Sequence, residues 1–197
     1  MDSVNKKIIE FFIENNMIKA EDKELYQYAL SITISALIHI FTLVVLGIIF
    51  GLLVESIVFY LCFIAIRKFA GGYHAKTAGG CYLFSVLLSV LLLITLKLSV
   101  LNISYIIAVT VFTVSFISLV CIWVMSPLDA ENNPLSEKEK NIYGKVAKVI
   151  SLLIFIVFSI LLLLNQYNIA LSMSFGIFMS ALVLTMRRIQ MLLTKTK

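Results

Sequence analysis

Long apolar runs alternate with short polar segments along the whole chain. Six runs stand out: Ala29 to Val54, Ile57 to Ile66, Tyr82 to Leu96, Ile103 to Met125, Val149 to Leu164 and Ile169 to Met186. A bilayer core about 30 Å thick needs roughly 20 apolar residues for each spanning helix. The first run is too long for one helix and the second too short, and moving residues 52–54 into the second run corrects both. The pattern predicts an all-α integral membrane protein with about six transmembrane helices.

Composition and charge support this prediction. The chain is 61% hydrophobic and 14% charged, whereas about a quarter of the residues of a soluble domain are charged. Lys97 apart, every Lys and Arg lies before the first run, between the second and third, between the fourth and fifth, or after the sixth. Six spans would place these four regions on one side, which the positive-inside rule makes cytoplasmic. We therefore expect a multi-pass cell-membrane protein with both termini in the cytoplasm. Its net charge of +5 suits anionic lipids rather than nucleic acid.

The chain is expected to form a single domain over residues 1–197, with an amphipathic N-terminal helix within residues 1–23. Residues 2–18 place charged and apolar side chains on different faces at helical spacing. This helix would lie on the membrane, or else be a solvated lead-in to the first span. Acidic residues interrupt its apolar positions, which argues against a cleavable signal peptide. Cys62 and Cys121 lie inside apolar runs, so a disulfide framework is not expected.

Three further features have competing interpretations. Gly47 and Gly51 form a GxxxG pattern that could be a helix–helix dimer contact, although a turn at Gly51 is the better interpretation. His39 is an ionisable residue within an apolar run, and a neutral histidine bonded to a neighbouring helix explains it as well as a functional role. Ser136 and Glu139 form a capping box that predicts the start of the fifth membrane helix.

The stretch RKFAGGYHAKTAGGC, residues 67–81, is a polar and glycine-rich interruption between the second and third runs. It holds four of the chain's eight glycines, at positions 71, 72, 79 and 80. Glycine costs about 1 kcal/mol relative to alanine inside a helix. The two pairs therefore predict backbone that bends at the cytoplasmic edge of the membrane, as a cytoplasmic or re-entrant loop over residues 67–81. Such backbone is tolerated at membrane depth only where protein or water satisfies its polar groups.

Cys81 and His74 are the candidate catalytic residues of this loop. Cys81 precedes an apolar run and so should lie near a helix N-terminus, where the helix dipole and a nearby imidazole favour the thiolate. A thiolate with a histidine base is the minimum apparatus for acyl transfer from a peptide bond. Arg67 and Lys68 add donors for a substrate carboxylate or an oxyanion. From spacing alone, a purely structural Cys and His is the commoner case. A metal site is disfavoured because the loop offers two good ligands where structural zinc takes four.

These residues resemble a known family. Residues 67–75 (RKFAGGYHA), followed by Cys81, resemble the signature of the accessory gene regulator B (AgrB) family of membrane peptidases. The interval of seven residues from His74 to Cys81 matches. The segment PLDAENNP, residues 127–134, is similar to one that follows the fourth span in relatives. The resemblance extends over nearly the whole chain.

The resemblance implies a quorum-sensing processing enzyme. It would be a cysteine peptidase that cuts the C-terminal part from an AgrD-type precursor peptide and cyclises the remainder to a thiolactone or lactone. Cys81 would be the nucleophile and His74 the base, with Gly71, Gly72 and Arg67 orienting them. Lys68 and Lys76 would join Arg67 in meeting an acidic peptide tail. No cofactor or metal is expected, and no third catalytic residue is identified. The sequence does not decide whether the protein forms a homodimer. A peptide exporter and a non-catalytic scaffold are the rival interpretations.

Overall fold

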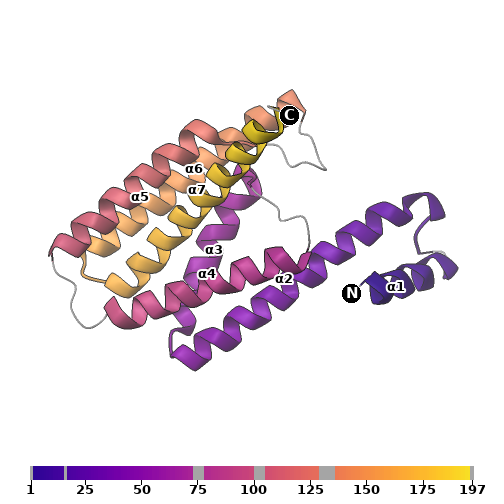
Figure 1. The fold of residues 1–197 in the computed structure, drawn as a ribbon, viewed down its shortest axis with the longest axis horizontal. Coiled ribbons are helices and arrows are strands. Elements are labelled where there is room, and N and C mark those ends of the chain that lie inside the picture. The colour runs from indigo at the N-terminus through magenta and orange to yellow at the C-terminus, as the bar shows by residue number, and fades with distance from the viewer. Residues whose placement is uncertain (1, 16, 73–77, 100–104, 129–135, 196–197) are drawn as a thin grey trace.

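The computed structural model describes residues 2–15, 17–72, 78–99, 105–128 and 136–195, and nearly all of this backbone is helical. Seven α-helices and one short 3-10 helix follow one another along the described chain (Figure 1). Their bounds are α1 Asp2–Glu14, η1 Ala20–Asp22, α2 Lys23–Phe50, α3 Leu53–Ala70, α4 Ala78–Ser99, α5 Tyr105–Met125, α6 Glu137–Leu163 and α7 Tyr167–Lys195. The predicted all-α architecture is confirmed.

Four of these helices are long and apolar enough to cross a membrane. They are α2 over Thr33–Phe50, α5 over Tyr105–Met125, α6 over Glu137–Leu163 and α7 over Tyr167–Leu193. Helix α3 has 18 residues but carries Glu55 in its first turn and Arg67 and Lys68 in its last, and the apolar part of α4, Ser85–Leu98, is shorter. The chain is therefore a multi-pass membrane protein, while the count of six spans stays a prediction.

Local chemistry explains where the helices begin and end. Gly51 ends α2 in the left-handed conformation (φ 68°), and its amide donates to the carbonyls of Gly47 and Ile48. The turn interpretation of Gly51 is thus confirmed. Gly47 is buried within this chain against α3, where a Cβ built on it would collide with Ser56 Oγ. At the start of α6, the amide of Glu139 donates to Ser136 Oγ, and the amide of Ser136 donates to Glu139 Oε2 at 2.8 Å. This confirms the predicted capping box.

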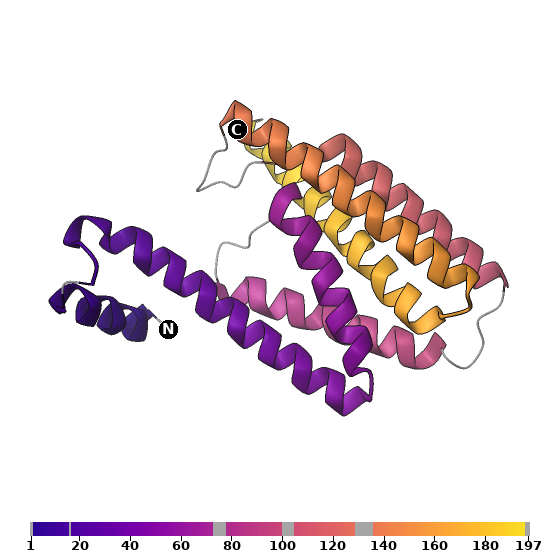
Figure 2. The same cartoon turned by 180° about the vertical axis from the view of Figure 1, so that it is seen from behind.

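Helix α1 is shorter than the predicted helix over residues 2–18. It ends at Glu14, and both the backbone and the side-chain amides of Asn15 donate to the carbonyl of Phe11. An asparagine side chain that bonds nearby backbone favours a helix end over its continuation. The helix lies beside the first part of α2 (Figures 1 and 2), where Ile9 is buried and Glu10 pairs with Lys23 at 3.5 Å. Phe11 on its apolar side stays exposed.

Helix α7 is the centre of the bundle. Figures 1 and 2 show it running beside α3, α5 and α6, and 67% of its membrane-crossing segment is buried against 11–22% in α2, α5 and α6. Small residues on α7 allow these neighbours to approach closely. A Cβ on Gly176 would lie 2.7 Å from Cys62 Cβ and 3.3 Å from the carbonyl oxygen of Phe59, both on α3. Ser174 bonds Ser115 of α5 across the interface at 2.7 Å.

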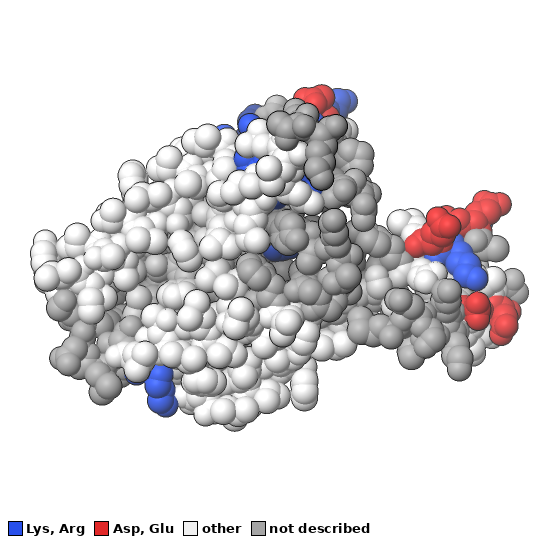
Figure 3. Space-filling model, viewed as in Figure 1, with Lys and Arg blue, Asp and Glu red and all other residues white. Residues whose placement is uncertain are grey.

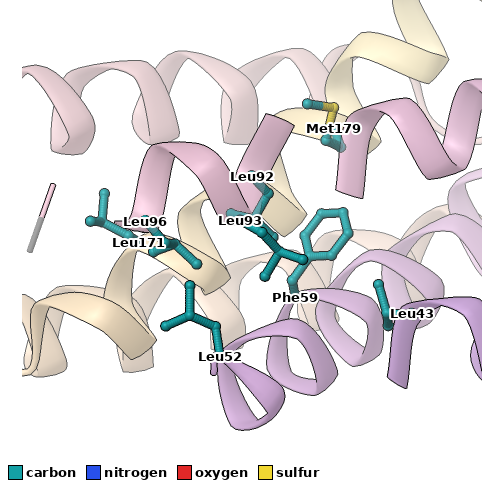
Figure 4. Close-up of a cluster of buried hydrophobic side chains, with 8 residues drawn as sticks. All are labelled: Leu43, Leu52, Phe59, Leu92, Leu93, Leu96, Leu171 and Met179. Atoms are coloured by element: carbon teal, nitrogen blue, oxygen red, sulfur yellow. The ribbon is translucent and has the colours of Figure 1, made fainter. Parts of the chain in front are cut away.

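A second contact joins α2 and α4 to this centre. A cluster of buried apolar side chains from α2, α3, α4 and α7 fills the space where these helices cross (Figure 4). It consists of Leu43, Leu52, Phe59, Leu92, Leu93, Leu96, Leu171 and Met179. At one end of this region, Lys97 Nζ donates to the carbonyl of Phe50 at 3.0 Å, which ties the end of α4 to the end of α2.

The contact at Gly176 yields a prediction for stability. Gly176→Ala should lower the free energy of unfolding by about 1–3 kcal/mol, because the new methyl group meets the Cβ of Cys62 and backbone of α3, which cannot move aside as a flexible side-chain end could. The measurement is the thermal unfolding midpoint of the detergent-solubilised protein. Ser159→Ala on α6, which removes a hydroxyl bonded to the carbonyl of Phe155 in its own helix, is the control. Equal midpoints for the two variants would contradict the close α3–α7 contact.

Candidate functional site

The stretch from Arg67 to Cys81 spans the end of α3 and the start of α4. Arg67 and Lys68 lie in the last turn of α3, and Cys81 is the fourth residue of α4. The predicted position of Cys81 near a helix N-terminus is confirmed. His74 and Lys76 fall in residues 73–77, outside the described residues. The pairing of His74 with Cys81 therefore stays a prediction.

The structure corrects the predicted extent of the loop. Residues 67–70 belong to α3, and Gly79 and Gly80 lie in the first turn of α4, so both ends of the predicted loop are helical. The second glycine pair was wrongly expected to bend the chain. A helix tolerates glycine in its first turn because the first four amides lack a partner within the helix in any case, so little is lost there relative to an interior position.

Gly71 is where the chain leaves α3, and it does so against the segment that follows α5. Its φ is +78°, and a Cβ built on it would collide with the carbonyl oxygen of Leu128. The amide of Leu128 donates to the carbonyl of Ala70 at 3.0 Å, and Gly71 forms a parallel bridge with Leu128. Only glycine fits this position, because both the conformation and the space exclude a side chain.

The same junction involves α6 and α7. A Cβ on Gly144 of α6 would lie 2.9 Å from Pro127 Cδ, so the start of the 127–134 segment rests on that helix. Gly72, with a φ of +138°, packs against α7, where its Cβ would lie 2.7 Å from Val183 Cγ1. The structure thus brings together the Gly-Gly pair and Pro127–Leu128, two stretches far apart in sequence. Residues 129–135 of the second stretch lie outside the described part of the chain.

Cationic side chains surround this junction. Arg67 is half-buried with its guanidinium 5.5 Å from the ring centroid of Phe63, and Lys68 is exposed with its ammonium 5.6 Å from the ring of Phe69. Phe69 in turn meets Tyr143 of α6 edge-on. The start of α6 and the end of α7 add further cations, namely Lys138, Lys140, Lys145, Lys148, Arg187 and Arg188. On the face drawn in Figure 3, most charged atoms gather at the top and at the right-hand end, and few Lys, Arg, Asp or Glu residues lie on the described surface elsewhere.

The sequence analysis used Arg187 only as one of the positive charges that indicate the cytoplasmic side, and did not include it among the candidate site residues. It lies one turn after Val183 on α7, its side chain is 8% exposed, and its Nη1 donates to Gln190 Oε1 at 2.8 Å. A buried guanidinium is uncommon, since arginine is almost never fully buried unless it is paired. Its position at the end of the sixth apolar run was visible in the sequence, but its burial depends on how α7 packs.

An apolar floor closes the bundle beneath the junction. Its buried members come from α3, α5, α6, α7 and the residues after α5, and they are Ile66, Ala70, Ile122, Leu128, Ala147, Ile177, Ala181 and Leu184. This cluster separates the cationic end from the middle of the bundle. The junction thus combines two glycines of positive φ with a buried apolar cluster, and Cys81 follows in the chain where α4 begins.

Comparison with known proteins gives a consistent picture. A family model described as "Accessory gene regulator B" matches residues 5–184. An AgrB-like protein 2 of Clostridium perfringens (strain 13 / Type A) is 25% identical over 195 residues, which cover 94% of this chain and 91% of that protein. An AgrB-like protein of C. perfringens strain SM101 is 24% identical over 93% of this chain and 86% of its own length. Protein FsrB of Enterococcus faecalis is 31% identical over 104 residues, half of this chain and 43% of FsrB. No solved structure matches the chain.

The Gly71 junction yields a second prediction. Gly71→Ala should lower the thermal unfolding midpoint more than Gly51→Ala does. Both glycines have positive φ, but a methyl group at position 71 meets the carbonyl of Leu128, whereas one at position 51 meets open space. The measurement is thermal unfolding of the two variants side by side in the same detergent. A Gly71→Ala variant no less stable than Gly51→Ala would contradict the contact between Gly71 and Leu128.

Proposed function

Because the chain belongs to the accessory gene regulator B family, we propose that it is a membrane-embedded cysteine endopeptidase of a quorum-sensing system. Its substrate is a small AgrD-type precursor peptide, from which it removes the C-terminal part and cyclises the remainder to a thiolactone or lactone. It acts in the cell membrane with both termini in the cytoplasm. The observation that carries the proposal is the position of Cys81 in the first turn of α4, the helix that follows the Gly71–Gly72 turn in the chain.

The first half of the reaction breaks a peptide bond of the precursor. The Cys81 thiol gives its proton to His74, and the thiolate sulfur attacks the scissile carbonyl carbon. The C–N bond then breaks, the proton passes from His74 to the departing amine, and the C-terminal fragment leaves. An acyl thioester on Cys81 remains. Unpaired amides in the first turn of α4 and the partial positive charge of the helix N-terminus favour the thiolate and the developing oxyanion.

The second half closes the ring. A thiol or hydroxyl from within the bound peptide gives its proton to His74 and attacks the thioester carbonyl. The bond from that carbon to the sulfur of Cys81 breaks, and the returning proton restores the thiol. Water competes for the same thioester, so a site that excludes water favours cyclisation over hydrolysis.

The surroundings also suit the proposed substrate. An amphipathic precursor helix would lie on the membrane surface, which concentrates it near the helix ends of this bundle. Arg67, Lys68 and Lys76 would meet acidic residues of its C-terminal tail. In support, Arg67 lies in the last turn of α3, where its contact with the ring of Phe63 limits the conformations of its long side chain.

The proposal is tested by mass spectrometry of a candidate precursor, ideally one encoded beside this gene, after co-expression with the full chain. Wild type should release the C-terminal tail and leave a fragment lighter by one water than the hydrolysed product, because ring closure replaces hydrolysis. Cys81→Ala should leave the precursor intact, and His74→Ala should slow processing by at least about a hundredfold, as expected for loss of a general base.

Cys121→Ala is the matched control, since Cys121 is a half-buried cysteine in the last turns of the apolar α5. Its processing should equal that of wild type. Full processing by Cys81→Ala would refute the assignment of the nucleophile and favour the exporter or scaffold interpretation. A linear fragment without a ring would show cleavage and refute the cyclisation step.

A further inference from the structure

A cluster of polar and aromatic side chains joins three helices one residue after Cys81. It consists of His39 and Thr42 on α2, Tyr60 on α3 and Tyr82 on α4, and we call it the Tyr82 cluster. Thr42 Oγ1 and the Tyr82 hydroxyl oxygen are 2.7 Å apart. The ring of His39 lies 5.5 Å from that of Tyr60 and 6.4 Å from that of Tyr82, measured between centroids.

The direction of the hydrogen bond between Thr42 and Tyr82 follows from its neighbours. Thr42 Oγ1 also lies 2.9 Å from the carbonyl oxygen of Ile38, which can only accept. A hydroxyl group has one proton to donate. Thr42 therefore donates to Ile38, and Tyr82 donates to Thr42. The resulting chain of two hydrogen bonds runs from the first turns of α4 to the backbone of α2, so it requires a donor at residue 82 and an acceptor at residue 42.

His39 supports the same contact by ring packing. Its plane is nearly perpendicular to that of Tyr82, at 87°, and tilted by 44° to that of Tyr60. Its Nδ1 is buried and has no hydrogen-bond partner among the described residues. The contacts with the two tyrosine rings give this nitrogen no hydrogen bond, but they fix the position of the imidazole. The side chain holds its place by packing on α3 and α4 at once.

This contact matters because of where it lies. The first turn of a helix lacks partners for its amides and frays unless other contacts hold it. Cys81 is in that turn of α4, and Tyr82 is bound directly to it in the chain. A reacting group misplaced by about 1 Å loses on the order of a hundredfold in rate.

We propose that Thr42, Tyr82 and His39 are positioning residues, which hold the first turn of α4 on α2 and thereby keep the thiol of Cys81 in place for reaction. The proposal rests on the proposed function, in which Cys81 is the nucleophile. It assigns to α2 a role in the reaction that the glycine-rich stretch alone does not supply. This role involves no contact between these three side chains and the substrate.

The test uses iodoacetamide as a probe of the Cys81 thiol in the detergent-solubilised full chain over a pH series. Trypsin releases Cys81 in the peptide 77–97, whereas Cys62 and Cys121 fall in the peptides 24–67 and 98–138, so mass spectrometry follows each cysteine separately. Thr42→Val and Tyr82→Phe each remove one end of the hydrogen bond with little change in shape. Each should slow alkylation of Cys81 by roughly three- to tenfold. Each should also move the pH midpoint of alkylation towards that of His74→Ala.

Two further variants separate positioning from a general loss of structure. Thr42→Ser keeps the acceptor and should restore the wild-type rate and pH midpoint. The double variant Thr42→Val with Tyr82→Phe should react no more slowly than either single variant, because both remove the same interaction. In the processing reaction, the single variants should lower kcat and leave KM nearly unchanged.

The matched controls are Thr110→Val and Tyr105→Phe on α5. Thr110 Oγ1 donates to the carbonyl of Ile106 in its own helix, as Thr42 does to Ile38, and Tyr105 is highly exposed. Both controls should alkylate at Cys81 like wild type. Wild-type alkylation in Thr42→Val and Tyr82→Phe would overturn the positioning role, as would an equal change at Cys121.

The two proposals fail in different ways. If Cys81→Ala abolishes processing while Thr42→Val and Tyr82→Phe match wild type in both assays, the proposed function stands and the positioning role is wrong. If Cys81→Ala processes the precursor normally, the proposed function is wrong. The alkylation series alone then decides whether the Tyr82 cluster holds the thiol.

Discussion

The hydrogen bond from the amide of Leu128 to the carbonyl of Ala70 fixes the point where the chain leaves α3. Backbone outside a helix is tolerated at membrane depth only where protein or water satisfies its polar groups. Here the end of α3 and the segment after α5 satisfy polar groups of each other's backbone, and Gly71 leaves room for the carbonyl of Leu128. Helices α6 and α7 meet the same junction through Gly144 and Gly72. Four helices thus converge where the polar stretch begins, which gives it a rigid origin.

The rest of the bundle supports that junction through α7. In lipid there is little hydrophobic gain in burying one apolar helix against another, so close packing and hydrogen bonds between helices have to hold them together. Gly176 brings α7 against the backbone of α3, and the Ser115–Ser174 hydrogen bond links it to α5. The same helix then carries Val183 to Gly72 and the buried Arg187 one turn further on. A change in the packing of α7 would therefore also shift the contacts at the junction.

The sequence predicts the local features of this structure well and the tertiary ones poorly. Apolar runs, the turn at Gly51, the Ser136 capping box and a helix start close before Cys81 all follow from chemistry within a few residues. The sides of the helices that face protein could not be predicted, because lipid-facing and buried positions are equally apolar. For the same reason the contact of Gly71 with Leu128, the burial of Arg187 and the bond between Thr42 and Tyr82 were missed. Each depends on two segments distant in sequence, and a single sequence shows no signal that pairs them.

The two ends of the segment that precedes Cys81 are held by different means. On one side Gly71 and Gly72 are fixed by backbone contacts with Leu128 and α7, where a side chain has no room. On the other side Tyr82 joins the start of α4 to α2 through its hydroxyl bond with Thr42 and one ring contact with His39, and His39 in turn contacts Tyr60 of α3. In the proposed reaction, the thioester intermediate would have to survive until a group of the same peptide reaches it, without first reacting with water. Both requirements favour a sulfur whose position varies little. Contacts of the backbone before it and of the helix after it would serve both requirements.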